Sequence, residues 1–155
     1  MEILFIIKHI RSFVFIVQGY DLHPYQKGVL LTMDESINVF GEKLEICGMD
    51  PVTGFYRDGE CNTCKDDIGF HTVCIETSQE FLDYTKLQGN DLSTPMPDYG
   101  FEGLESGDSW CVCAERWLEA EKSGMAPKLN LQSTHIRALE IIPMELLKKY
   151  AVDDQ

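Results

Sequence analysis

The sequence predicts a small α+β domain, with a mostly antiparallel sheet, two principal helices and a short C-terminal helix. From residue 37 onward, short segments rich in β-branched and aromatic residues alternate with segments of helical periodicity. Dipeptides that favour turns, such as Asp50-Pro51 and Asp58-Gly59, separate these segments. With 155 residues, of which 44% are hydrophobic and 25% are charged, the chain is long enough to bury one hydrophobic core.

The predicted strands are short. A tight hairpin is expected at Asp58-Gly59, because this dipeptide favours a two-residue turn between strands. Residues 70–76 (FHTVCIE) are the best strand candidate, and the alternation of a strand would place His71 and Cys74 on opposite faces. Two further strands are expected at 128–132 and 137–142.

Capping and stop signals predict one helix near the middle of the chain and one at its end. Thr77 and Glu80 form a capping box, which opens a helix that Gly89 should end. The C-terminal helix is expected to follow Pro143, a residue suited to the first helical position, and to run through Tyr150.

A second principal helix is predicted over residues 110–123, capped by Asp108 and ended by Gly124. An apolar stripe of helical spacing supports it, and in this helix Cys113 would face the core. Cys111 would lie in the first turn, where the helix dipole favours a thiolate. A strand through 110–114 is the alternative, and it would put both sulfur atoms on one side.

Residues 89–108 contain two prolines and show neither a helical nor a strand period. Apolar residues recur along this segment, so we expect an ordered loop rather than a disordered one. Long loops inside compact domains tend to be functional. We therefore expect it to act as a ligand loop, with Asn90, Asp91 and Thr94 as its candidate residues.

The charge balance excludes some partners. A net charge of −13 repels phosphate backbones and anionic lipid headgroups, so a nucleic acid is not expected to bind. Six cysteines in a chain of this length fall short of a disulfide-rich scaffold. We therefore expect a cytoplasmic protein with reduced thiols.

The N-terminal segment is apolar but matches neither a transmembrane helix nor a signal peptide. Lys8 and Arg11 interrupt it, so no stretch approaches the ~20 apolar residues that a bilayer requires. Glu2 stands where a signal peptide carries positive charge.

A domain boundary is therefore expected near Met33. Residues 33–155 would form a single globular domain, and residues 1–32 would be an apolar leader outside the fold. The alternative is a weak contact of residues 3–17 with a membrane surface.

Thiols and an imidazole are concentrated in residues 61–74, in the order C-x2-C-x6-H-x2-C. Mixed sulfur and imidazole ligands suit zinc. The spacing between Cys64 and His71 is short, however, since finger-type sites usually have about a dozen residues or more between their two ligand pairs. With a later pair of cysteines added, the candidate zinc ligands are Cys61, Cys64, His71, Cys74, Cys111 and Cys113.

Two other functions are open. The first is a thiol-based redox protein or enzyme that uses Cys111 as its catalytic group, with a second cysteine to resolve it. The other is a partner-binding module in which the cysteines only pack, since free cysteine is often buried. His135 is expected to be structural. The distances between sulfur atoms should discriminate between these functions, because a cluster of four sulfur atoms indicates a metal site and a close pair indicates redox chemistry.

Five longer motifs resemble a known family. DPVTGFYRDGEC, GFHTVC, EFLDYTKLQGNDLSTP, GDSWCVCAERWLEA and THIRALEII are similar to the signature blocks of an uncharacterised, mainly bacterial family, domain of unknown function 2237. The resemblance covers about residues 38–151 and implies no known activity. It implies that the family signature includes the positions of Cys47, Cys61, His71, Cys74, Cys111 and Cys113. The position of Cys64 often holds another residue, which favours a meeting in space of Cys61, Cys74 and the 111/113 pair.

Overall fold

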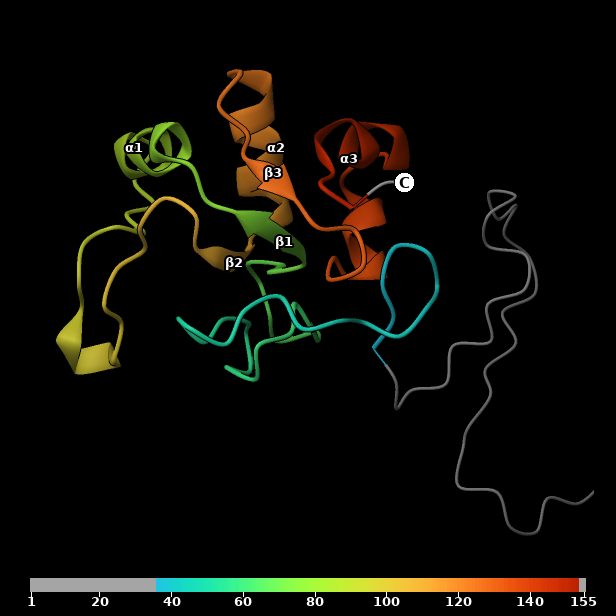
Figure 1. Ribbon diagram of the computed structural model, residues 1–155, viewed down its shortest axis with the longest axis horizontal. Helices are drawn as coiled ribbons and strands as arrows, with labels where there is room; N and C mark the ends of the chain where they lie inside the picture. The colour runs from blue at the N-terminus through green and yellow to red at the C-terminus, as the bar shows by residue number, and fades with distance from the viewer. Residues whose placement is uncertain (1–35, 154–155) are drawn as a thin grey trace, which may run out of the picture. The chain divides into compact units, whose positions relative to one another are not determined.

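The computed structural model describes residues 36–153 (Figure 1). The expected leader, its membrane-surface contact through residues 3–17 and the boundary at Met33 lie outside the described residues. Among residues 36–153, no helix has the length and apolar character needed to cross a membrane.

A three-stranded antiparallel sheet in the order β2-β1-β3 lies at the centre of the described fold. The strands are β1 (Val73–Glu76), β2 (Ser109–Val112) and β3 (Lys128–Leu129). In the register of the first pair, Cys74 stands directly opposite Cys111. The α+β class with a small antiparallel sheet is thus confirmed.

Three helices complete the fold: α1 (Gln79–Leu87), α2 (Ala114–Lys122) and α3 (Met144–Tyr150). The cap of α1 differs from the prediction, because the Ser78 side chain accepts a hydrogen bond from the Phe81 N–H at 3.2 Å. The Thr77 hydroxyl instead donates to the Glu105 carbonyl at 2.6 Å. Gly89 ends α1 with a left-handed φ of 84°, as expected.

The predicted helix over 110–123 is wrong at its start. Residues 109–112 form β2, and α2 begins only at Ala114. The apolar stripe is real, but residues 109–112 pair with β1, and this pairing leaves Trp110 and Val112 buried, so tertiary context overrides the local pattern. The alternative strand is therefore correct for residues 110–112, but it does not continue through 114, because Cys113 is already the N-cap of α2.

The C-terminal strands are also shorter than predicted. Only Lys128–Leu129 form a strand, and the segment expected as a strand at 137–142 contains a 3-10 helix, η3 (Ile136–Glu140). The side chain of His135 caps η3, because its Nδ1 accepts from the Arg137 N–H at 3.1 Å. No strand forms beside Asp58-Gly59 either, where the chain makes turns.

The two faces of the sheet have different partners (Figure 1). Val73 and Ile75 point into the main hydrophobic core, which the helices complete and in which Trp117 and Phe81 are fully buried. Cys74 lies between them in β1, so the alternation of the strand turns it to the other face. There it meets cysteines from the segment 36–72, and this second face positions the functional site.

Candidate functional site

Two disulfides occupy the second face of the sheet. Cys74 of β1 bonds to Cys47, and Cys111 of β2 bonds to Cys61, with Cα–Cα distances of 5.6 and 5.2 Å. The sulfur atoms of Cys47, Cys61 and Cys74 all lie within 4.8 Å of one another, so the two disulfides are in contact. The expectation that all thiols are reduced is therefore wrong for these four cysteines, because strand pairing and the loops before it bring them within bonding reach.

The structure divides the six predicted zinc ligands. Cys61, Cys74 and Cys111 belong to the disulfide cluster, whereas Cys64, His71 and Cys113 lie outside the group of three close sulfur atoms. The expected meeting of Cys61, Cys74 and Cys111 occurs, but as disulfides. Cys64 and Cys113 are the free cysteines among residues 36–153, and both are partly exposed.

Cys111 does not have the environment that its predicted reactivity required. It lies in β2 rather than in a helical turn, is only 2% exposed, and donates its N–H to Thr53 Oγ1 at 2.8 Å. No helix dipole acts on its sulfur there. A catalytic use of Cys111 stays a prediction, and in this arrangement it would require reduction of the bond to Cys61.

Cys113, predicted to be a core residue, is instead the free thiol at the start of a helix. It is the N-cap residue of α2, with ψ of 129°, and its carbonyl accepts the first helical hydrogen bond from the Trp117 N–H at 3.0 Å. No side chain caps this first turn. The N–H groups of Glu115 and Arg116 therefore lie where a helix leaves its donors unpaired, next to the sulfur.

His71 is held by Asp67, a residue that the sequence analysis did not select. Asp67 is 2% exposed, and its Oδ1 lies 2.6 Å from His71 Nδ1. Its Oδ2 accepts from the His71 N–H and from Thr63 Oγ1, each at 2.9 Å. Burial acts most strongly on this carboxyl and opposes its ionisation, but the hydrogen bonds from His71 and Thr63 together outweigh it and lower the pKa of Asp67.

A strained turn brings His71 to Cys113. Phe70 has a left-handed φ of 55°, which is costly for a bulky residue, and its carbonyl accepts from the Ala114 N–H at 3.0 Å. The residue before His71 is thereby fastened to the residue after Cys113. A Cβ at Gly69 would lie 2.5 Å from His71 Cε1 and 3.1 Å from Cys113 Sγ, so only glycine fits between them.

The imidazole of His71 is tuned toward its protonated form. The hydrogen bond with Cys113 is the largest cause, and Asp67 adds to it, so that together they raise the pKa of His71 to about 9 against the effect of burial. The ring of Phe55 stacks on His71 with centroids 6.4 Å apart. Cys113, His71 and Asp67 thus stand in the order of a nucleophile, a base and an orienting carboxylate.

A hollow of about 430 Å³ opens beside Cys113. Gly69 and Ile68, whose side chain is 96% exposed, form one side of it. Arg116 and Glu119 of α2 line it as well and are joined by an ion pair of 2.9 Å. The thiol at the helix start is therefore accessible to a small molecule.

The remaining free thiol and the remaining described histidine have other environments. The Tyr56 hydroxyl hydrogen-bonds Cys64 and, with backbone donors, lowers the pKa of this partly exposed thiol. Burial, above all, lowers the pKa of His135 to about 4, so this residue is neutral at pH 7 and serves as the cap of η3. The expected structural role of His135 agrees with this geometry.

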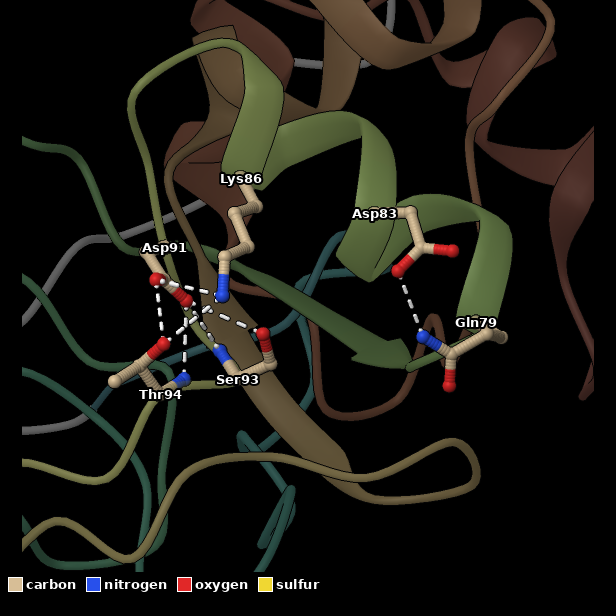
Figure 2. A network of polar contacts seen from close by, with 6 residues as sticks. All are labelled: Gln79, Asp83, Lys86, Asp91, Ser93 and Thr94. Carbon is tan, nitrogen blue, oxygen red and sulfur yellow. Dashed lines mark hydrogen bonds and ion pairs between the residues drawn. The ribbon is translucent and has the colours of Figure 1, made fainter.

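The loop 89–108 is ordered, as predicted. Asp91 organises it, because its carboxylate accepts from the backbone and hydroxyl groups of Ser93 and Thr94 and lies 3.1 Å from Lys86 Nζ (Figure 2). Asn90 donates its amide to Thr85 Oγ1 at the end of α1. These contacts fasten the loop to α1, and binding of a ligand by Asn90, Asp91 and Thr94 stays a prediction.

Fold and site together define a small α+β protein with two adjacent disulfides and a free cysteine beside a His–Asp pair. The chain belongs to the family described as "uncharacterized protein conserved in bacteria" (DUF2237), whose model matches residues 37–151. No curated protein matches the chain.

Asp67 was missed because it looked like one more charge in an acidic surface segment. A signal was nevertheless present, since Asp67 precedes His71 by four residues with Gly69 between them. The choice between Cys111 and Cys113 depended on where the helix begins. The predicted helix began at residue 110 and α2 begins at Ala114, and this boundary error of four residues moved the predicted reactive thiol from Cys113 to Cys111.

Proposed function

We propose that the protein is a thiol-dependent enzyme of acyl transfer, in which Cys113 is the nucleophile, His71 the proton carrier and Asp67 the positioning residue. The observation that carries this proposal is the place of His71 between a buried carboxylate at 2.6 Å and the free thiol of Cys113, which are so close that a single Cβ at Gly69 would touch both the imidazole and the sulfur. Nucleophile, base and orienting group in hydrogen-bond reach are the signature of an activated cysteine on many unrelated folds.

The charges of the site support nucleophilic attack. Because the pKa of His71 is raised to about 9, its imidazole carries a proton at pH 7. The nucleophilic form of a cysteine such as Cys113 is the thiolate. The thiolate would attack the carbonyl carbon of an ester, thioester or amide and form a carbon–sulfur bond. His71 would then give its proton to the leaving group as the carbonyl bond to that group breaks.

Hydrolysis of the acyl-enzyme would follow with the roles of His71 reversed. The neutral imidazole takes a proton from water, the hydroxide formed attacks the thioester, and the Cys113 thiolate leaves. Asp67 keeps the Nδ1 atom of His71 occupied, so that Nε2 is left for the sulfur and the water. No oxidant or metal takes part in this sequence.

The start of α2 supports the same chemistry. The attacked carbonyl develops negative charge on its oxygen, and the unpaired N–H groups of Glu115 and Arg116 are donors of the kind that stabilise such an oxyanion. Losing one donor of this kind typically lowers kcat by roughly 10²–10³-fold. Glu115→Pro would remove one of these N–H donors, and proline is tolerated in the first turn of a helix.

The test is acylation by a small activated ester. With p-nitrophenyl acetate, one acetyl group per chain should appear on Cys113, and p-nitrophenolate should be released in turnover. Cys113→Ala should abolish both, His71→Ala should lower the rate roughly 10²-fold or more because the general acid–base group is lost, and Cys64→Ala is the matched control with an unchanged rate. Equal rates for wild type and Cys113→Ala would overturn the proposal.

Zinc binding by thiolates is a second candidate. The three sulfur atoms of Cys47, Cys61 and Cys74 within 4.8 Å support it, with Cys111 attached to Cys61 as a fourth. Zinc requires thiolates, so each disulfide would first take two electrons and two protons from a dithiol reductant.

Metal titration of the reduced protein tests this second candidate. Under argon, protein reduced with a dithiol should bind about one Zn²⁺ per chain, and Cys61→Ser or Cys74→Ser should release it, whereas Cys64→Ser should not. Absence of stoichiometric zinc from the reduced wild type would leave these four cysteines to disulfides alone.

A further inference from the structure

A groove of about 570 Å³ adjoins His71 on the side of Phe55. It runs between the turn at residues 54–57 and the long loop 89–108. Trp110 of β2 also lines it. Since His71 is the group that would exchange protons with a substrate, a neighbouring groove is where the rest of that substrate would lie.

The groove exposes aromatic side chains to solvent. Tyr99 is 82% exposed and Phe55 is 40% exposed, although both rings would gain from burial. Trp110 lies deeper, at 8% exposure, and is packed against Phe101 with ring centroids 5.6 Å apart. Aromatic surfaces that converge on one groove suit a flat apolar group in the ligand.

One cation in the groove has no anionic partner. The guanidinium of Arg57 stands 5.0 Å above the ring of Trp110, and its Nη1 donates to the Val52 carbonyl at 3.3 Å. Among residues 36–153, no carboxylate lies within 4.0 Å of it, although Asp50 and Glu102 line the adjoining hollow. Arg57 also has a left-handed φ of 56°, a conformation that costs free energy in a residue other than glycine.

The one acidic residue that lines the groove is already neutralised. Asp91 is surrounded by Ser93, Thr94 and the ammonium group of Lys86 (Figure 2). Its charge is therefore not available to pair with Arg57. His71, which also lines the groove, is paired with Asp67 in the same way. Arg57 is therefore the cation that the groove offers to an anion, in a chain whose net charge is −13.

We propose that this groove binds an aromatic carboxylate as part of the substrate, with the ring against Phe55, Tyr99 and Trp110 and the carboxylate on Arg57. The inference rests on the proposed function, since it names the class of acyl substrate for that same site. Arg57 is the specificity-determining residue, because a planar guanidinium binds a carboxylate through two parallel hydrogen bonds. The overall negative charge of the chain disfavours anions, so any preference for a carboxylate must arise locally.

The experiment compares 3-phenylpropionate with 3-phenylpropanamide, which have the same ring and differ in charge. Binding is followed by NMR on the full chain with Cys113→Ala, so that the result does not depend on acylation. The carboxylate should bind at least about tenfold more tightly than the amide, because a charge-assisted hydrogen bond to Arg57 is lost in the amide. The Trp110 indole resonance should shift with either ligand.

Two variants make the outcome specific. Arg57→Gln should remove the preference for the carboxylate and leave the affinity for the amide unchanged, whereas Lys148→Gln on α3 removes a positive charge outside the groove and should change neither. Equal affinities for the two ligands, or a preference that survives Arg57→Gln, would overturn the inference. Failure of the acetylation of Cys113 would refute the proposed chemistry without affecting this binding result, so the two can fail separately.

Discussion

At the scale of residues, the site depends on three side chains whose protonation states are linked. His71 has two partners. Its Nδ1 atom hydrogen-bonds Asp67, and the Cys113 sulfur also lies beside the imidazole. Asp67 is buried and anionic, so it favours the imidazolium form. Cys113 is the largest cause of the raised pKa of His71, and Asp67 adds to it.

The first prediction concerns the pKa of His71. Cys113→Ala removes the largest cause of its elevation, so the pKa should fall from about 9 toward the ordinary value of 6.5. At pH 8 the imidazole would then be protonated in the wild type and mainly neutral in the variant. NMR titration of the His71 Cε1 proton measures this, with Cys64→Ala as the control. A pKa that stays near 9 in Cys113→Ala would mean that Asp67 alone sets it.

The second prediction concerns the glycine between the two reactive groups. A methyl group at position 69 would lie 2.5 Å from His71 Cε1, so Gly69→Ala should push the imidazole away from Cys113. We expect the rate of Cys113 alkylation at pH 7 to fall on the order of 10-fold or more, because misplacement of a catalytic group by about an ångström has effects of that size. An unchanged rate would show that the two side chains do not need their close approach. The melting temperature serves as the check that the variant folds.

At the scale of elements, the disulfide between Cys61 and Cys111 joins the two parts of the site. Cys61 begins the loop that carries Asp67 and His71, while Cys111 lies in β2 two residues before Cys113. The bond therefore fixes the base to the strand that leads to the nucleophile. The bond between Cys47 and Cys74 fastens the same face and closes a loop that includes His71, but it has no end in β2, the strand that leads to Cys113.

The third prediction compares these two disulfides. The double variant Cys61→Ser/Cys111→Ser should lower the free energy of unfolding by about 2–4 kcal/mol, because it releases a loop of 50 residues in the unfolded chain. It should also slow alkylation of Cys113. The variant Cys47→Ser/Cys74→Ser, with a loop of 27 residues, should lose comparable stability and retain more of the reactivity. Urea unfolding and alkylation kinetics without reductant measure both effects, and equal loss of reactivity in the two variants would contradict this role of the Cys61–Cys111 bond.

Local signals predicted the elements whose ends are marked by the sequence itself. Gly89 and Gly124 end their helices in left-handed conformations, and the C-terminal helix follows Pro143. The cross-strand pair of Cys74 and Cys111 depends on residues 37 positions apart, and no local pattern encodes that pairing. Cys113 lies at the start of α2 only because β2 ends at Val112. Since the periodicity of the sequence does not mark that boundary, the reactive cysteine could not be chosen from it.

At the scale of the whole molecule, the described elements and both disulfides lie within residues 36–153. We propose that residues 33–155 fold by themselves, because this part contains its own hydrophobic core. A chain that begins at Met33 should therefore melt within a few degrees of the full chain by calorimetry. A fall of many degrees would place part of the stabilising core in residues 1–32.

The central claim is that Cys113, activated by His71, is the reactive thiol of this protein. Competitive alkylation measures it most directly: the full chain is treated with limiting iodoacetamide at pH 7 without reductant, and the modified sites are quantified by peptide mass spectrometry. Cys113 should be labelled well ahead of Cys64, the other free cysteine of residues 36–153, and His71→Ala should slow Cys113 roughly tenfold or more while leaving Cys64 unchanged. Labelling of Cys64 first, or a Cys113 rate that does not change in His71→Ala, would contradict the account.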